Sequence, residues 1–181
     1  MRIIDNHYAF LNNVLEEDIR KNILDYAETV TNDDTWIDCS YQDWHALQDT
    51  AWAVYEKVFH KLLAICDNPL NPYLDDFNSW NSFFRIQLKR VKPGFVRNNI
   101  HRDSDWKQMA VVIYLSNEGE GTKLYKTNDP SSYFHTVPFI PNTGIAHIPS
   151  ETSWHDYDHN NKFTSDRITL MFLMADKRFY K

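Results

Sequence analysis

The second half of the chain, from Ser82 to Ala175, alternates short patterned runs with turn residues. The segment SFFRIQLKRV at 82–91 places apolar and polar side chains in alternation, which is the pattern of a strand with one buried face. Further runs that predict strands lie at 99–103, 108–116, 122–126, 136–140, 145–149 and 166–175. Many short strands joined by turns favour a barrel or jelly roll over a helical bundle.

The glycines of the chain support these strand boundaries. There are only four, at positions 94, 119, 121 and 144, and all of them lie at expected turns. Glu118–Gly121 favours a hairpin whose return strand is 122–126, and Pro141–Gly144 has the composition of a turn. We therefore expect each glycine outside the regular strands.

The first half of the chain carries two helical patterns. Apolar residues recur at every fourth position from Leu15 to Ala27, with acidic residues in the opening turn, which predicts a helix over 14–29. An apolar stripe at 47–65 predicts a second helix, which Pro69 ends. Residues 2–12 predict a short edge strand, and 30–45 a loop with one short strand at most.

Two helices ahead of a β-rich half indicate an α+β chain that is mainly β, with the helices packed on one sheet. The length of 181 residues suits one domain with a substantial core. Because we find neither a linker nor an internal repeat, we expect a single domain over 1–181, with a helical part at 1–80 and a β core at 82–176.

The charge balance narrows the classes of partner. A net charge of −6 gives no overall attraction for nucleic acid or an anionic membrane, so we expect neither as a partner. Segment 85–107 is nevertheless locally basic. Because its charged residues alternate with apolar ones, a solvated strand face is the favoured interpretation, and a patch that attracts an acidic substrate is the second.

Several features together predict a cytoplasmic protein. The opening MRIIDNHYAF lacks the apolar core of a signal peptide, and the apolar runs are too short to span a bilayer. Cys39 and Cys66 have no metal-type spacing, which is typical of unpaired thiols in a reducing compartment. The sequence does not predict an oligomeric state.

His101 and Asp103 lie two residues apart on an expected strand, so their side chains would share one face. With a second histidine they would form the two-His, one-carboxylate set that leaves metal positions open for chemistry. The sequence alone leaves four candidates for that histidine, at 135, 147, 155 and 159. The alternative for the pair is a surface turn in which Asp103 accepts backbone hydrogen bonds.

Arg167 opens the last apolar strand, 12 positions after His155. The planar guanidinium donates two parallel hydrogen bonds to a carboxylate, and a buried arginine needs an anionic partner. The alternative is a surface ion pair with Asp158 or Asp166.

The full series of motifs resembles the Fe(II)- and 2-oxoglutarate-dependent dioxygenases, and in particular the prolyl 4-hydroxylase-like branch. The resemblance covers residues 84–175, about half of the chain, and preserves the order and spacing of its elements. These elements are His101-x-Asp103, Tyr114-Leu115, Gly121-Thr-Lys-Leu124, Pro149-Ser150, His155 and Arg167-Ile-Thr169-Leu170.

The resemblance implies a double-stranded β-helix (jelly roll) in which His101, Asp103 and His155 bind Fe(II) and serve catalysis. It further implies that 2-oxoglutarate chelates the iron through its keto-acid end. Arg167 would hold the distal carboxylate, with Thr169 and Tyr114 as further contacts of this cosubstrate.

The implied reaction hydroxylates a C–H bond with O2 and releases succinate and CO2. Asp103 favours hydroxylation over halogenation, because related halogenases lack that carboxylate. The implied substrate is a peptide or protein side chain, with proline as the leading candidate, or a small metabolite. Nucleic-acid demethylation is disfavoured because position 173, where that branch carries a second arginine, is leucine.

Two other functions are compatible with the same residues. One is a catalytically silent β-barrel binding module. The other is a cupin-type metal enzyme that uses His147 with His155 and needs no 2-oxoglutarate. The complete set of four residues argues against the first, and Arg167 argues against the second.

Overall fold

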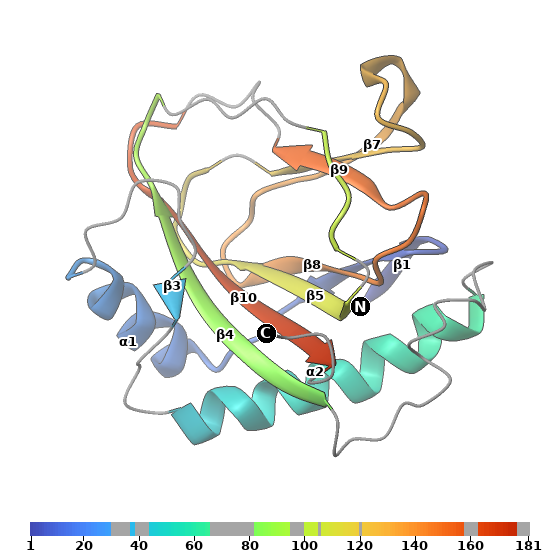
Figure 1. Ribbon diagram of the computed structural model, residues 1–181. Coiled ribbons are helices and arrows are strands. Elements are labelled where there is room, and N and C mark those ends of the chain that lie inside the picture. The colour runs from blue at the N-terminus through green and yellow to red at the C-terminus, as the bar shows by residue number, and fades with distance from the viewer. Residues whose placement is uncertain are drawn as a thin grey trace.

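The computed structural model describes residues 1–29, 37–38, 44–65, 82–94, 100–104, 106–119, 121–157 and 163–176. In this part of the chain, strands form a seven-stranded sheet in the order β1-β2-β8-β5-β10-β4-β3 and a three-stranded sheet in the order β7-β6-β9. All the strand pairs are antiparallel. Both α-helices lie on one side of the large sheet, and the small sheet lies on the other (Figure 1).

The elements follow one another in a simple order along the chain. The first half contains β1 (Arg2–Asp5), β2 (Tyr8–Asn12), α1 (Glu17–Ala27), β3 (Ile37–Asp38) and α2 (Trp44–Ile65). The second half contains β4 (Ser82–Val91), β5 (Lys107–Tyr114), β6 (Thr122–Tyr125), the 3-10 turn η2 (Pro130–Ser132), β7 (Tyr133–Val137), β8 (Thr143–His147), β9 (Trp154–Tyr157) and β10 (Arg167–Asp176).

Both expected helices are present, and their apolar stripes form the main core. Ile23 and Ala27 of α1 and Leu47 and Leu62 of α2 are fully buried against the large sheet. The sheet contributes alternate residues from its helix-facing side, such as Ile86 in β4. The prediction of two helices packed on one face of a mainly β protein is therefore confirmed.

The opposite face of the large sheet carries three rows of side chains that run across its strands. Residues two apart on a strand share a face, so adjacent rows are separated by roughly 7 Å. The strand registers define them as the Lys89 row (Lys89, Thr169, Tyr114, Thr143), the Gln87 row (Gln87, Met171, Val112, Ile145) and the Arg85 row (Arg85, Leu173, Ala110, His147, Tyr8).

Arg85, Gln87 and Lys89 of β4 therefore point between the two sheets. Lys89 is fully buried and Gln87 is only 5% exposed. The favoured interpretation of the basic segment as a solvated face was wrong for Gln87 and Lys89, because Phe84, Ile86 and Leu88 face the helices and leave these two residues on the interior side.

One strand pairing expected in the β-rich half was also wrong, and one expectation for the first half was incomplete. Segment 122–126 is not the return strand of a hairpin, because β5 pairs with β8 and β10 whereas β6 pairs with β7 and β9 in the small sheet. Residues 2–12 contain the expected short edge strand, β1, and also a second strand, β2, which lies inside the sheet between β1 and β8. The strand expected near 136–140 is β7, which begins earlier, at Tyr133.

The glycines divide into turn and strand positions. Gly94 has a φ of 83° and lies at the expected turn. Gly144, by contrast, lies inside β8, where an added Cβ would sit 2.3 Å from the carbonyl oxygen of Val112. The positive φ of the preceding turn belongs to Asn142. Gly144 is thus required by close packing of two strands, and its expected place in a turn was wrong.

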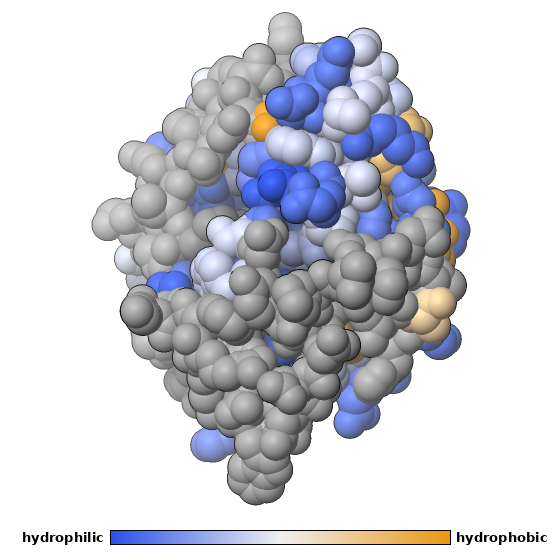
Figure 2. Space-filling view, turned by 45° about the vertical axis from the view of Figure 1, so that its right-hand side comes forward, coloured by the Kyte–Doolittle hydropathy of each residue, from blue (hydrophilic) through white to orange (hydrophobic). Residues whose placement is uncertain are grey.

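The surface of the described residues exposes few large apolar side chains. Only Met1, Ile3, Tyr133 and Ile140 are exposed among them, and the face in Figure 2 is mainly hydrophilic where it is coloured. No helix within the described ranges is long and apolar enough to cross a membrane. Cys39 and Cys66, on which the expected reducing compartment rested, lie outside the described residues.

Candidate functional site

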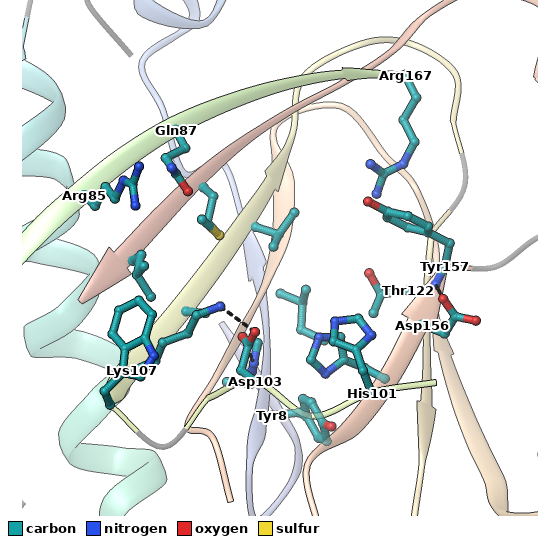
Figure 3. Close-up of a pocket in the computed structure, with 18 residues that line it drawn as sticks. Tyr8, Arg85, Gln87, His101, Asp103, Lys107, Thr122, Asp156, Tyr157 and Arg167 are labelled. Carbon is teal, nitrogen blue, oxygen red and sulfur yellow. Dashed lines mark hydrogen bonds and ion pairs between the residues drawn. The ribbon is translucent and has the colours of Figure 1, made fainter. Parts of the chain in front are cut away.

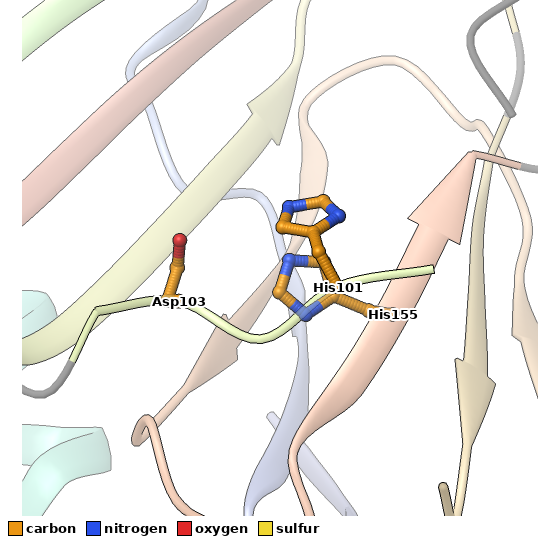
Figure 4. A group of neighbouring side chains, drawn as sticks. All are labelled: His101, Asp103 and His155. Carbon is orange, nitrogen blue, oxygen red and sulfur yellow. The ribbon is translucent and has the colours of Figure 1, made fainter. Parts of the chain in front are cut away.

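His101, Asp103 and His155 converge between the two sheets, with their potential ligand atoms all within 4.8 Å of one another (Figure 4). His155 comes from β9, a strand that is not among those predicted from the sequence. A metal ion with bonds of about 2.1 Å needs ligand atoms roughly 3 Å apart, so small side-chain rotations would complete the set. The three residues thus offer two imidazoles and one carboxylate to one position.

Backbone contacts bring the two histidines together. His101 N–H donates to the carbonyl of His155 at 3.1 Å, and His155 N–H donates to the carbonyl of His101 at 2.9 Å. Among the described residues of 99–103, this isolated bridge replaces the expected strand. The convergence of His101 and Asp103 therefore depends on this bridge and on the partners of Asp103, because no regular strand holds them.

Asp103 is held by two side chains from the large sheet. Its Oδ2 lies 2.9 Å from Nε2 of His147, and its Oδ1 accepts a hydrogen bond from Nζ of Lys107 at 2.5 Å. Burial alone would raise the pKa of Asp103, but the hydrogen bond and charge of His147 and the charge of Lys107 keep the pKa well below its usual value. The carboxylate is therefore ionised and fixed in direction.

His155 is presented in the form that binds a metal. Burial, and then the charge of nearby His147, lowers the pKa of His155 to about 3, so its ring is neutral near pH 7. Its Nδ1 lies 3.2 Å from the carbonyl oxygen of Ser153 and must be the protonated nitrogen, since a carbonyl only accepts. The lone pair of Nε2 is then available to a metal.

Two buried cationic side chains, those of Arg167 and Lys89, contact Tyr157 at the other end of the site. Arg167 is 2% exposed, and its Cζ lies 4.5 Å from the centre of the Tyr157 ring (Figure 3). Lys89 donates from Nζ to the Tyr157 hydroxyl at 2.6 Å. Arg167 is thus not at the surface, and Asp166, offered as its partner in the alternative, contacts Arg90 instead.

Thr169 and Tyr114 lie in the Lys89 row, next to this cationic end. The Thr169 side chain is fully buried, and its Oγ1 has no hydrogen-bond partner in the described part of the chain. Burial raises the pKa of Tyr114 to about 12, so its hydroxyl is neutral, and this hydroxyl is 2.7 Å from Oγ1 of Thr122. A buried hydroxyl without a partner is costly, so a hydrogen-bond acceptor placed beside Thr169 would be stabilising.

One cavity of about 290 Å³ joins the two ends. His101, Asp103 and His155 line it together with Arg167 and Tyr157. A molecule in this cavity can therefore contact a metal at one end and a guanidinium at the other. These observations fit Fe(II) and 2-oxoglutarate, because the donor set leaves metal positions open and the far end is cationic with a hydroxyl beside it.

The sequence did not predict the roles of two residues near this site. Lys89 was part of a basic segment interpreted as solvated, and its alternation with apolar residues was the only signal for a buried face. His147 was considered as a metal ligand in the cupin-type alternative, whereas its ring nitrogen lies beside Asp103. No pattern in the sequence connects position 147 with position 103.

Comparisons with known proteins give the fold a context. No protein-family model matches the sequence, and no curated protein is significantly similar to it. A prolyl-4-hydroxylase of Pseudomonas putida matches with a TM-score of 0.56 at 14% identity, over 93% of this chain and 92% of that one. A Trichoplax adhaerens prolyl hydroxylase, in complex with a hypoxia inducible factor peptide fragment, matches with 0.57 at 13%, over 96% and 85%.

A third solved structure widens the range of chemistry on this fold. The epimerase SnoN, in complex with Fe3+, alpha ketoglutarate and nogalamycin RO, matches with a TM-score of 0.52 at 11% identity, over 93% of this chain and 78% of that one. The chain therefore has the jelly-roll fold of 2-oxoglutarate- and iron-dependent oxygenases, and the expected double-stranded β-helix is confirmed. At these identities the likeness defines the fold, and the function has to be argued from the site.

Proposed function

We propose that this protein is an Fe(II)- and 2-oxoglutarate-dependent oxygenase that hydroxylates an unactivated C–H bond and releases succinate and CO2. The observation that supports this function is a single cavity lined by His101, Asp103, His155 and the buried Arg167. A purely structural metal site would close its shell with protein ligands and would not need a buried cation at the far end.

In this proposal His101, Asp103 and His155 hold the ferrous ion. The bound iron and 2-oxoglutarate together supply the oxidation: one oxygen atom of O2 enters succinate and the other enters the substrate C–H bond. His155 contributes a neutral nitrogen. Asp103 contributes a carboxylate, and its contacts with His147 and Lys107 fix the orientation of this group. The chain's own task is to orient the reactants and exclude water.

Arg167 would receive the distal carboxylate of 2-oxoglutarate through its two parallel N–H groups. Thr169 would donate its hydroxyl to the same carboxylate and so gain the partner that it lacks among the described residues. Lys89 adds a second positive charge from the same row of the sheet. Tyr114 lies close by, although its hydroxyl is already bonded to Thr122, so its contribution would be to shape the wall.

The substrate in this proposal is a peptide or protein side chain, with proline as the leading candidate, or a small metabolite. The complex of the Trichoplax enzyme with a peptide fragment supports the first of these for a protein of this fold. The cytoplasm remains the proposed compartment. The cupin-type alternative is not favoured, because His147 already binds the Asp103 carboxylate.

Anaerobic thermal unfolding with Fe(II) and 2-oxoglutarate tests the proposal. A ligand that binds only the folded state at a hundred times its Kd stabilises it by about 2.7 kcal/mol, and we expect the melting temperature to rise with 2-oxoglutarate concentration. His101→Ala and Arg167→Ala should abolish this rise. His45→Ala and Arg2→Ala, at exposed positions, are the matched controls. A wild-type protein that gains no stability and forms no succinate in air would contradict the proposal.

A further inference from the structure

Trp154, the residue before His155 on β9, makes three contacts that fix its place. Its carbonyl oxygen accepts a hydrogen bond from the Tyr8 hydroxyl at 3.0 Å. The centre of its ring lies 5.3 Å from Cζ of Arg102, and its indole N–H donates to the carbonyl oxygen of Glu151 at 3.0 Å. Two segments that are far from β9 in the sequence therefore reach this one residue.

Tyr8 connects the large sheet to Trp154. It belongs to β2, is 1% exposed and lines the metal end of the cavity (Figure 3). Because a carbonyl oxygen only accepts hydrogen bonds, the Tyr8 hydroxyl must donate its proton to Trp154. The Tyr8 ring also lies 5.8 Å from the ring of His147, which binds Asp103. One side chain thus contacts the strand that carries one proposed ligand and the partner that holds another.

Arg102 connects the other two proposed ligands to the same residue. It lies between His101 and Asp103 in the sequence, and its guanidinium lies over the Trp154 ring. Its Nη1 also forms an ion pair with Oε2 of Glu151 at 2.6 Å, but the Glu151 side chain is 77% exposed. Ion pairs of exposed groups contribute little, so the contact of the guanidinium with the ring is the more important of the two.

These contacts matter because the described segment 100–104 forms no regular strand. Two backbone hydrogen bonds between His101 and His155 join this segment to β9, and Asp103 is held separately from the large sheet. Arg102 adds a further attachment to β9 through its side chain. Ligands that are already in place bind a metal more tightly, because less of the binding free energy is lost in ordering them.

We infer that Trp154 is the anchor of the metal site: through Tyr8 and Arg102 it holds the segments that carry the three ligands in place before a metal ion binds. Tyr8 and Arg102 are positioning residues, because neither is a proposed ligand and each acts through Trp154. This inference rests on the proposed function for the identity of the metal site, and it adds the residues that set the affinity of that site.

Hydrogen exchange in the metal-free protein tests the attachment independently of the proposed function. Tyr8→Phe keeps the ring and removes only the hydroxyl, and Arg102→Met removes the guanidinium from an unbranched side chain. The amides of His101 and His155 donate to each other's carbonyl groups. In both variants we expect these two amides to exchange about tenfold faster than in the wild type, while the amides of β10 stay protected.

Titration with Co(II), whose visible absorption reports the geometry of its ligands, tests the consequence for the metal. We expect Tyr8→Phe and Arg102→Met each to bind Co(II) about tenfold more weakly than the wild type and with a changed spectrum, since residues that orient metal ligands have effects of this size. Arg102→Lys keeps the charge but stacks poorly on a ring, so its affinity should be intermediate. Glu151→Gln should bind Co(II) as the wild type does.

Two control variants separate positioning from a general loss of stability. Tyr133→Phe removes a hydroxyl of the small sheet that lies 3.0 Å from Oγ1 of Thr136. Arg20→Met breaks an ion pair with Glu17, whose side chain is 70% exposed. Neither control should change the Co(II) affinity or the exchange of the two bridge amides.

Amide exchange or Co(II) affinity that stays at the wild-type value in Tyr8→Phe and Arg102→Met would overturn the inference. Equal effects in the control variants would also overturn it. A wild-type protein that binds Co(II) but not 2-oxoglutarate would instead overturn the proposed function and leave the anchor standing. A wild-type protein that binds no Co(II) would overturn both.

Discussion

Individual residues of the site show opposite responses to burial. His155 is kept neutral, because burial lowers its pKa to about 3, whereas Asp103 stays ionised because His147 and Lys107 bind it. Burial disfavours the charged form of both side chains. Asp103 nevertheless stays charged, because its hydrogen-bonded partners lower its pKa by more than burial raises it. One neutral nitrogen and one fixed anion are what a divalent metal requires of these two positions.

The shifted pKa of His155 predicts acid sensitivity of the metal-free protein. Between pH about 3 and 6.5 the unfolded chain binds a proton at His155 that the folded chain does not bind. The stability contributed by this group is therefore complete above pH 6.5 and is lost as the pH falls toward 3. The loss is at most about 1.4 kcal/mol per pH unit, and it is smaller here because the ring is partly exposed.

Urea unfolding with a chelator present, repeated from pH 4 to 7, measures this effect. His155→Asn should lose stability less steeply with falling pH than the wild type does. Equal slopes in the two proteins would show that His155 is not the group that titrates.

Replacing Lys89 should lower the affinity for 2-oxoglutarate selectively. Lys89→Met should weaken 2-oxoglutarate binding by about tenfold, because it removes one of two buried cations near the proposed position of the distal carboxylate. It should leave the binding of 2-oxopentanoate unchanged, since that acid lacks the distal carboxylate. Calorimetry with both ligands measures the difference, and Lys21→Met, at an exposed position, is the control. Equal losses for the two ligands would indicate a packing defect at Lys89.

Residues that share a linear motif were predictable, and residues joined only by the fold were not. His101 and Asp103 could be paired from their spacing, whereas His155 was chosen among four histidines, together with Arg167, through the resemblance to the dioxygenases; the structure places all four on one cavity. Lys89 could not be selected, because alternation reads the same whether the polar face of a strand meets water or a ligand cavity. That choice depends on which face the helices cover.

At the level of elements, local pattern predicted strands well and their partners poorly. The sequence correctly indicates β4, β5 and β10, whose alternation or apolar content is long and clear. It gave β6 to the wrong neighbour, since Glu118–Gly121 signals a reversal of the chain but does not say which sheet receives the next strand. An added Cβ at Gly121 would lie 2.1 Å from the carbonyl oxygen of Val137, so close packing in the small sheet is what this glycine permits.

Gly144 offers a test of this distinction between turns and strands. Gly144→Ala should lower the free energy of unfolding by about 3 kcal/mol, because the new Cβ would collide with a backbone carbonyl that cannot rotate away. Gly94→Ala is the matched control: its φ of 83° is strained for alanine, but no atom lies within 4 Å, so we expect a loss of about 1 kcal/mol. Chemical denaturation measures both, and equal losses would contradict the assignment.

For the whole molecule, the sequence predicted the layered plan. Helical periodicity followed by strand alternation gave two helices on one sheet, and the motif series gave the jelly roll. The single domain over 1–181 stays a prediction. The second apolar layer, between the sheets, was not predicted as such, because its members Tyr8, Tyr114, Leu124, Val137 and Ile145 come from five different strands.

The backbone bridge between His101 and His155 gives the metal a mechanical consequence for the two sheets. His155 belongs to the small sheet and His101 is bonded to it, while Asp103 is tied to β8 and β5 of the large sheet. A metal bound by all three would therefore cross-link the sheets, and its removal would let the small sheet open as a separate cooperative unit.

Hydrogen exchange would show this uncoupling directly. On addition of a chelator, amides of β6, β7 and β9 should lose protection, whereas those of β4, β5 and β10, which the helices cover, should keep theirs. Uniform loss in both sheets would mean that the molecule opens as one unit. If only the small sheet loses protection, the metal ion also determines how long the cavity between the sheets stays closed to water.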